Sequence, residues 1–100
     1  MQLKLITPEK IFFEGDIASV QVPGTEGDFG VLPGHAPFIS TIRPGVVTID
    51  LAGGEQRKII VVGGVAEVTP EQTIVLAEKA EDCSNLSDAE TAEKLSALAA

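Results

Sequence analysis

The stretch Gly24-Thr25-Glu26-Gly27-Asp28-Phe29-Gly30-Val31-Leu32-Pro33-Gly34-His35-Ala36-Pro37-Phe38-Ile39-Ser40 decides the fold of this chain. It holds four of the ten glycines, two of the six prolines and the only histidine, so turns concentrate here. Its first three glycines allow the backbone to take positive φ or to bend at three points. Pro33-Gly34 predicts a tight turn, and Pro37 favours an extended residue before it, so we expect a strand to begin at Phe38.

The acidic residues of this stretch exclude one common use of glycine-rich loops. A phosphate cradle needs backbone amides beside a lysine, whereas Glu26 and Asp28 are carboxylates and no helix pattern follows them. Two carboxylates at this spacing are more typical of a solvated strand edge than of an acid/base pair.

Short apolar runs separated by turn residues extend outward from this stretch. They predict strands over residues 3–7, 11–13, 17–22, 38–43, 46–51, 58–62, 65–69 and 73–77. In the third run we expect Ala18, Val20 and Val22 on one face. Residues 58–62 are apolar on both faces, which indicates a central strand or an outer face that meets another protein. Gly63-Gly64 indicates a bulge or a close backbone approach. The pattern predicts a mainly β chain, a β-sandwich or barrel.

The end of the chain changes to a helical pattern. Residues 81–85 are polar and predict a linker, and Ser87 with Glu90 matches a capping box. Apolar side chains recur on one helical face at Ala92, Leu95, Leu98 and Ala99, and Glu90 with Lys94 predicts an i,i+4 pair. We therefore expect a domain over residues 1–80, then a linker and one short helix over 81–100 that is stable only when docked.

The composition limits the kinds of partner that this chain can bind. The formal net charge of −8, from 15 acidic and 7 basic residues, disfavours nucleic acid and anionic lipid. The single cysteine, Cys83, forms no internal disulfide and predicts a linker thiol in a reducing compartment. The longest run of apolar residues and glycines covers only residues 59–66, too few to cross a bilayer, so we expect membrane association only through a partner.

Three blocks of sequence resemble one family. The run from Glu26 to Pro37, followed by Ile42-Arg43-Pro44-Gly45, is similar to the ε subunit of bacterial F-type ATP synthase, whose mitochondrial counterpart is the δ subunit. Residues 63–68 and 75–78 supply two further matching blocks in the same order. The resemblance extends from about residue 3 to residue 92.

The resemblance implies a two-sheet β-sandwich of about ten short strands followed by a helix. It also implies a non-catalytic subunit of the central stalk that bridges the γ subunit and the c ring, couples proton flow to ATP synthesis and lies at the cytoplasmic face of the bacterial inner membrane. It places the partner interface in one loop, from Glu26 to Pro37, at the end of the sandwich that faces the c ring, with the residues Glu26, Asp28, Phe29, Gly30, Val31, Pro33, Gly34, His35, Ala36 and Pro37. Family members continue into a two-helix hairpin, whereas this sequence reaches Ala100 within or just after the first helix. The alternative hypothesis is a free-standing β-sandwich binding module.

Catalytic, metal and nucleotide functions lack support in the sequence. His35 has no nucleophile at motif spacing, and one histidine with one cysteine cannot complete a zinc site. A lone histidine beside Pro33-Gly34 is usually a turn residue bonded to backbone, although the resemblance favours an interface position. ATP-binding members of the family carry an arginine at the start of the first helix where this chain has Glu90, so we expect no cofactor and no nucleotide binding.

Overall fold

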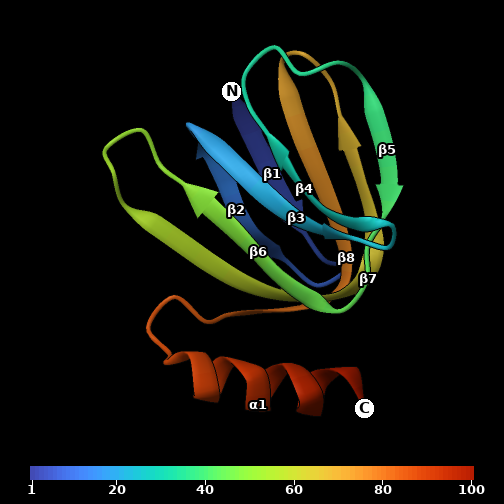
Figure 1. Ribbon diagram of the computed structural model, residues 1–100, viewed down its shortest axis with the longest axis vertical. Coiled ribbons are helices and arrows are strands. Elements are labelled where there is room, and N and C mark those ends of the chain that lie inside the picture. The colour runs from blue at the N-terminus through green and yellow to red at the C-terminus, as the bar shows by residue number, and fades with distance from the viewer.

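The computed structural model describes residues 1–100 as eight strands followed by one helix (Figure 1). The elements are β1 Gln2–Ile6, β2 Ile11–Asp16, β3 Ser19–Gly24, β4 Gly27–Val31, β5 Phe38–Thr41, β6 Gly45–Asp50, β7 Gln56–Val68, β8 Gln72–Asp82 and α1 Asp88–Ala99.

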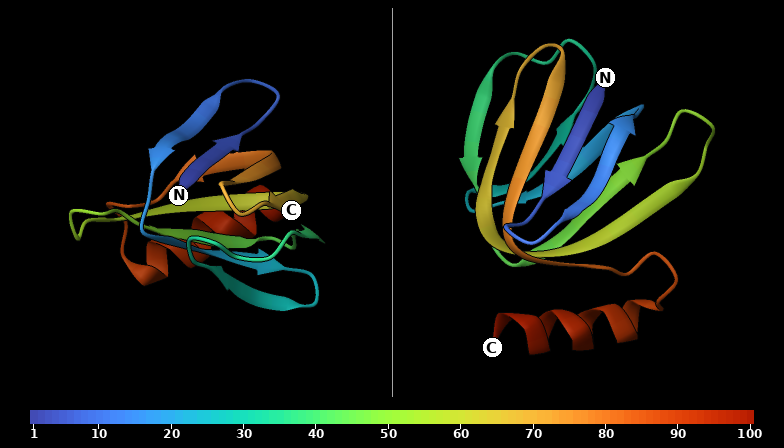
Figure 2. Two further views of the ribbon diagram at one scale, coloured as in Figure 1. Left: turned by 90° about the horizontal axis from the view of Figure 1, so that it is seen from above. Right: turned by 180° about the vertical axis from the view of Figure 1, so that it is seen from behind.

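The strands form a single hydrogen-bonded sheet that folds over into two layers (Figures 1 and 2). Its order is β2-β1-β8-β7-β6-β3-β4, with β5 paired to β7, and only the β1–β8 pair is parallel. The long strand β7 joins the layers, because its first half pairs with β6 and its last four residues pair with β5. The β-sandwich prediction is confirmed. The structure has eight strands, whereas the resemblance implied about ten, and residues 58–62 and 65–69, predicted as separate strands, belong to the one strand β7.

The sheet bends at Gly63-Gly64 without an inserted residue. The β7–β8 register is continuous from Val62 opposite Lys79 to Gly64 opposite Ala77. Both glycines have positive φ, 68° and 120°. Of the two alternatives predicted for this dipeptide, the structure shows the close backbone approach, and the bend lets one pair of strands serve both layers.

The core lies between the layers and is almost wholly aliphatic. Its largest fully buried members come from six strands: Leu3, Leu5, Val20, Val22, Val31, Val47, Ile49, Ile59, Val61, Val68 and Val75. The prediction for Ala18 is wrong, because Ala18 is exposed and Ile17 is buried instead. The alternation begins only at Ser19, since the amides of Ile17 and Ala18 bond to two different neighbours, the carbonyls of Met1 and Asp50.

The C-terminal helix α1 packs on the β6–β7 side of the sandwich. Its capping box is confirmed: the Ser87 hydroxyl accepts from the Glu90 amide, and the Glu90 carboxylate accepts from the Ser87 amide. The predicted Glu90–Lys94 pair is wrong, because Glu90 is engaged in the cap and Lys94 Nζ lies 2.7 Å from the Glu81 carboxylate on β8. The helix buries none of its own residues completely, so polar contacts carry much of its docking.

Two residues expected in the linker, Glu81 and Asp82, end strand β8 instead. Cys83 follows as a free thiol that is only 1% exposed, so it is a buried residue rather than a solvated one. Ile60, on the central strand β7, is also fully buried but faces away from the main core cluster. Its neighbour across the sheet, Val46, lines a cavity together with Leu95 of α1. The second apolar face of residues 58–62 is therefore covered by this chain's own helix. No helix of the structure is long and apolar enough to cross a membrane.

Candidate interaction surfaces

The predicted site residues belong to three different parts of the structure. Thr25 and Glu26 form the tip of the β3–β4 hairpin, Gly27–Val31 is strand β4, and residues 32–37 form a turn that leads into β5. The prediction of one continuous loop is wrong, because β4 pairs along its whole length with β3. At about 3.3 Å per residue, the strand separates Glu26 from Leu32 by about 20 Å.

The turn after β4 has the predicted geometry. The His35 amide donates to the Leu32 carbonyl at 3.1 Å, and Gly34 takes a φ of 81°, as the third residue of a type II turn requires. The His35 ring bonds through Nδ1 to the Ala36 carbonyl at 2.7 Å. A carbonyl oxygen only accepts, so Nδ1 carries the proton. His35 is thus a turn residue bonded to backbone, half-buried at the surface.

The hairpin tip is tied to the segment that follows β5. The Thr25 amide donates to the Thr41 carbonyl at 3.0 Å, and the two threonine hydroxyls lie 2.7 Å apart. The Arg43 guanidinium donates to the Gly24 carbonyl at 2.5 Å and also binds the Asp28 carboxylate. Asp28 is therefore paired, whereas Glu26 is exposed and forms no ion pair.

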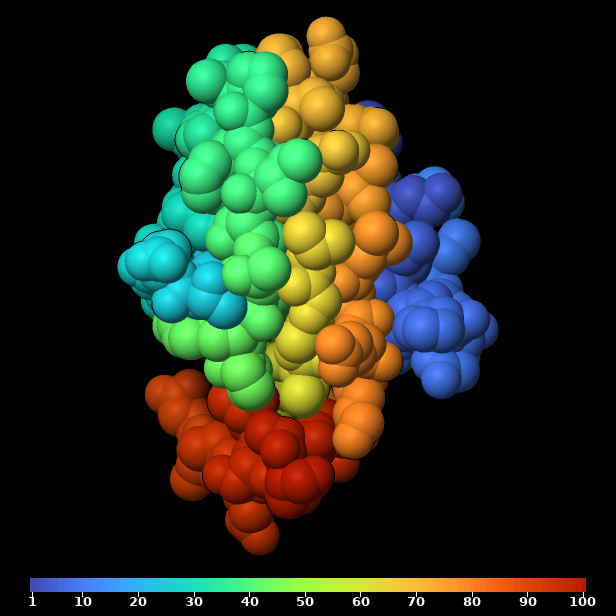
Figure 3. Space-filling model, turned by 90° about the vertical axis from the view of Figure 1, so that its right-hand side faces the viewer, coloured from blue at the N-terminus to red at the C-terminus, as the bar shows by residue number.

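An open groove of about 450 Å³ runs between β4 and β5, and we call it the β4–β5 groove. It is lined by Thr25, Glu26, Gly27, Asp28, Phe29, Phe38, Ile39, Ser40 and Thr41. At its floor Phe29 and Phe38 meet edge to face with ring centroids 5.1 Å apart, and the His35 ring lies 6.4 Å from Phe38. In Figure 3 strand β5 (green) occupies this face, with the β3–β4 hairpin (cyan) beside it.

The groove brings together only part of the predicted set. Glu26, Asp28 and Phe29 line it, and His35 reaches it through Phe38. Val31 lies in the core with no exposed surface, so it contacts no partner. Sequence reasoning missed the side chains of Leu32, Phe38 and Ile39, which are 64%, 43% and 66% exposed. Their signal was present, since three large apolar residues flank the turn, but Phe38 and Ile39 were predicted only as part of a strand and Leu32 only as part of the turn-rich stretch.

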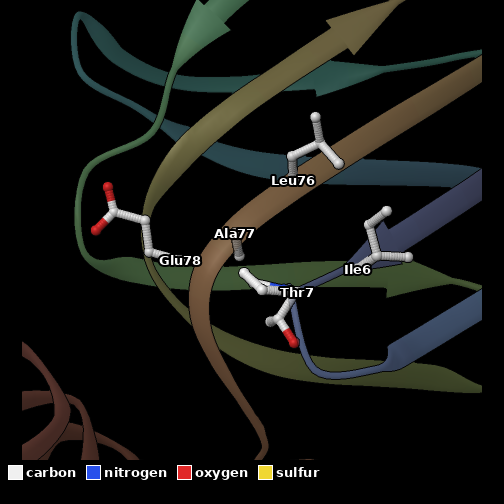
Figure 4. A pocket seen from close by; sticks show the side chains of 6 residues that line it. Ile6, Thr7, Leu76, Ala77 and Glu78 are labelled. Carbon is white, nitrogen blue, oxygen red and sulfur yellow. The ribbon is translucent and has the colours of Figure 1, made fainter.

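A second apolar surface lies on the outer face of the β2–β1–β8 layer. Cross-strand pairing places Ile11 opposite Ile6, Ile6 opposite Leu76, and Leu76 opposite Val65, which forms a row across four strands. We call Ile11, Ile6, Leu76 and Val65 the aliphatic row. Ile11 and Leu76 are 53% and 46% exposed, and a cavity of about 340 Å³ lies beside Ile6 and Leu76 (Figure 4).

The titratable groups with shifted pKa values lie away from both surfaces. Burial raises the pKa of the Cys83 thiol, and hydrogen bonds from Ser87 lower the pKa of Glu90. The hydrogen bond and charge of Glu81 raise the pKa of Lys94. Burial acts to raise the pKa of Asp82, but hydrogen bonds from Ser84 and Arg57 outweigh it, and the pKa is lowered. All four residues belong to the end of β8, the linker or α1.

The arrangement suits binding rather than chemistry. A catalytic site gathers titratable groups with displaced pKa values in a cleft, whereas none of these four residues lines the β4–β5 groove or the cavity beside the aliphatic row. The structure also holds no cluster of three or more His, Cys, Asp or Glu side chains that could bind a metal ion. A rigid sandwich with two exposed apolar surfaces defines a protein-interaction domain.

Comparison with known proteins identifies the family. Residues 1–83 match the model of the ATP synthase Delta/Epsilon chain beta-sandwich domain. An ATP synthase epsilon chain of Bradyrhizobium sp. strain BTAi1 is 49% identical over 96 residues, which cover 96% of this chain and 70% of that relative. One of Rhodospirillum rubrum is 47% identical over 87 residues, covering 87% and 65%. The chain belongs to the ATP synthase epsilon chain family and is a non-catalytic subunit.

Two solved structures share the fold. A chain of the Euglena gracilis mitochondrial ATP synthase (OSCP/F1/c-ring) superposes with a TM-score of 0.79 at 22% identity, covering 95% of this chain and 61% of that one. A chain of the Tetrahymena thermophila mitochondrial ATP synthase central stalk/c-ring gives 0.69 at 13% identity, covering 98% and 90%. The predicted family and non-catalytic class are confirmed.

Proposed function

We propose that this chain works in the central stalk of a bacterial F-type ATP synthase, at the cytoplasmic face of the inner membrane, where it bridges the γ subunit and the c ring. In this position it couples proton flow to ATP synthesis and reaches the membrane only through these partners. The observation that carries the proposal is the presence of two separate exposed apolar surfaces on one sandwich, the β4–β5 groove and the aliphatic row. A bridging subunit needs two such surfaces.

The surface assigned to the c ring consists of the hairpin tip, the β4–β5 groove and the turn after β4. It includes the exposed residues of the predicted interface and adds Leu32, Phe38 and Ile39. Aromatic and aliphatic side chains that are exposed together are what the centre of a protein interface requires. Glu26 supplies an unpaired carboxylate for a hydrogen-bond donor or a cation on the ring.

The aliphatic row is the surface assigned to the γ subunit. It lies on the outer face of the layer formed by β2, β1, β8 and the end of β7, and an opposite-charge pair flanks it on β1 and β2, with Lys4 Nζ 3.7 Å from the Glu14 carboxylate. A flat apolar strip with a polar rim is the usual composition of a stable protein contact. We therefore expect the two partners to bind independently.

Torque transmission requires that the two surfaces move as one body. Strand β7 carries Val65 of the aliphatic row, and its last four residues pair with β5, which lines the groove. The two surfaces are thus joined by one continuous set of backbone hydrogen bonds. Preorganised interfaces on regular strands are held more precisely than interfaces on loops.

Paired variants test the proposal. The double variant Pro33→Ala/His35→Ala alters only the exposed turn, so the free energy of unfolding should fall by no more than about 1–2 kcal/mol. We expect it to impair proton-driven ATP synthesis in reconstituted vesicles while the chain still co-purifies with γ. Leu76→Ser on the aliphatic row should weaken co-purification with γ.

Glu55→Ala, in the exposed turn between β6 and β7, is the matched control and should change neither measurement. If the double variant unfolds outright, the turn is part of the core architecture and the assignment loses its support. If it folds and synthesises ATP normally, the turn does not face the ring.

A further inference from the structure

We propose that Arg43 is a positioning residue that fixes the β3–β4 hairpin tip, and with it Glu26, in the orientation that the ring-facing surface requires. This inference rests on the proposed function and names the residue that organises its interface. Arg43 lies just after β5, and its side chain reaches back to the hairpin.

The contacts of Arg43 hold both strands of the hairpin beside its tip. One guanidinium nitrogen donates to the carbonyl of Gly24, the last residue of β3, and the other binds the carboxylate of Asp28 on β4. The amide of Arg43 also donates to the Pro23 carbonyl at 3.0 Å. Only a planar guanidinium offers two donors in fixed directions, so a lysine at this position satisfies one acceptor and leaves the other.

The backbone at the base of the tip, at Gly24 and Gly45, leaves no room for a side chain. A Cβ on Gly24 would lie 2.8 Å from the Gly27 carbonyl, and one on Gly45 would lie 2.7 Å from the Pro23 side chain. An isolated bridge pairs Gly24 with Ile42. The junction thereby joins the β3–β4 edge of one layer to the β5 edge of the other, beside the hydrogen bonds between Thr25 and Thr41.

The pairing also determines which charge a partner meets. Arg43 neutralises Asp28, so Glu26 is the one carboxylate of the tip without an ion pair. Both side chains of the Arg43–Asp28 pair are more than 40% exposed. Ion pairs at this exposure contribute little to folding stability, so the effect of the contact falls on the position of the tip rather than on the fold.

The test compares variants of the Arg43–Asp28 pair with a variant of an equivalent ion pair elsewhere in the chain. Arg57 pairs with Asp82 at 2.5 Å with similar exposure, at the end of β8. We would record NMR order parameters of the amides of residues 24–28 in the isolated chain for Arg43→Met, Arg43→Lys, Asp28→Asn, Glu26→Gln and Arg57→Met. Glu26→Gln and Asp28→Asn each remove one negative charge from the tip, but only Asp28 binds Arg43. A difference between the two variants therefore reports the contact with Arg43 rather than the charge.

We expect the order parameters of the tip to fall from about 0.85 to below about 0.6 in Arg43→Met and Asp28→Asn, with Arg43→Lys intermediate. Glu26→Gln and Arg57→Met should leave them unchanged. In reconstituted vesicles Arg43→Met should reduce proton-driven ATP synthesis several-fold, because a mobile tip must be ordered each time it binds the ring, which costs binding free energy. Arg57→Met should not reduce synthesis.

A rigid tip in Arg43→Met overturns the proposal, as does an equal loss of synthesis in Arg57→Met. If the tip loosens and synthesis persists while Pro33→Ala/His35→Ala impairs it, the positioning role fails and the proposed function stands. If neither Arg43→Met nor Pro33→Ala/His35→Ala affects synthesis, both the positioning role and the assignment of the ring-facing surface fail.

Discussion

Gly64 lies so close to strand β8 that a Cβ added to it would stand 1.9 Å from the carbonyl oxygen of Leu76. Its φ of 120° is also a conformation that other residues rarely adopt. This approach lets β7 bend without losing its register with β8, and the bend folds one sheet into a sandwich. Gly64 is therefore the residue on which the two-layer arrangement depends.

We expect Gly64→Ala to lower the free energy of unfolding by about 3 kcal/mol or more, because the methyl group must displace the β8 backbone and the residue must keep a strained φ. Urea unfolding followed by circular dichroism measures this. The matched control is Gly53→Ala in the β6–β7 turn, where no atom lies within 4 Å of the added Cβ and φ is not positive. Equal stabilities for the two variants would show that the close approach is not rigid.

Alternation and turn residues are local signals, so they predicted a β-sandwich or barrel, and the family resemblance implied the sandwich. The sequence did not predict strand β4, since Gly27 and Gly30 lower the strand propensity of that segment. Pairing with β3 overrides this propensity, and a local sequence pattern does not show which strands pair with each other. Likewise the spacing of Glu90 and Lys94 on one helix face predicted an ion pair, whereas Lys94 binds Glu81 from a distant strand.

The candidate site was predicted in part for a similar reason. Proline and glycine specify the turn at Pro33-Gly34 through their own φ values, so this feature was readable from the sequence and the structure has it. Whether Phe38 and Ile39 face the core or the solvent depends on the layer opposite them. The sequence carries no direct record of that layer, and both side chains lie in the groove.

Asp82 gives a pH-dependent contribution to stability. Its pKa lies below the ordinary value of 3.8, because hydrogen bonds from Ser84 and Arg57 outweigh the effect of burial. A carboxylate with a lowered pKa in the folded state stabilises the fold above its unfolded pKa, and the contribution is lost as the pH falls through the folded pKa. We expect Asp82→Asn to lower the melting temperature at neutral pH by about 2–4 °C, a small shift because the pair is exposed.

The difference between wild type and Asp82→Asn should shrink as the pH falls below 3.8 and the wild-type carboxylate becomes protonated. Thermal unfolding across this range measures it, with Glu55→Gln in an exposed turn as the control. A difference that stays constant with pH would assign the effect to the side-chain amide rather than to the charge.

The start of α1 is predicted not to bind ATP. A helix N-terminus attracts anions, but here Asp88 and Glu90 occupy the first turn, and the Glu90 carboxylate accepts from the Ser87 amide at 3.0 Å. The hydrogen bonds from Ser87 keep the pKa of Glu90 low, so the carboxylate is charged at neutral pH and repels phosphate. Calorimetry of the isolated chain should show no saturable heat at millimolar ATP, and a saturable signal would refute the prediction.

The final prediction concerns the role of α1 in the assembled enzyme. Its 12 residues span only about 18 Å at about 1.5 Å per residue. Lys94 binds Glu81, and the Lys79 ammonium lies 3.5 Å from the Leu98 carbonyl, so the middle and the C-terminal end of the helix are tied to β8. We expect a helix held in this way to stay packed on the sandwich. Deleting residues 85–100 should therefore leave ATP hydrolysis by the assembled enzyme unchanged.

The same deletion should lower the stability of the sandwich modestly, because α1 shields the β6–β7 face but buries no residue of its own completely. We would measure ATP hydrolysis by the complex beside urea unfolding of the truncated chain, with Lys94→Met as a variant that keeps the helix and removes its ion pair. A several-fold activation of hydrolysis on deletion, with Lys94→Met showing part of it, would mean that α1 leaves the sandwich and inhibits the enzyme. Unchanged hydrolysis with a lower urea midpoint would establish α1 as a structural cover.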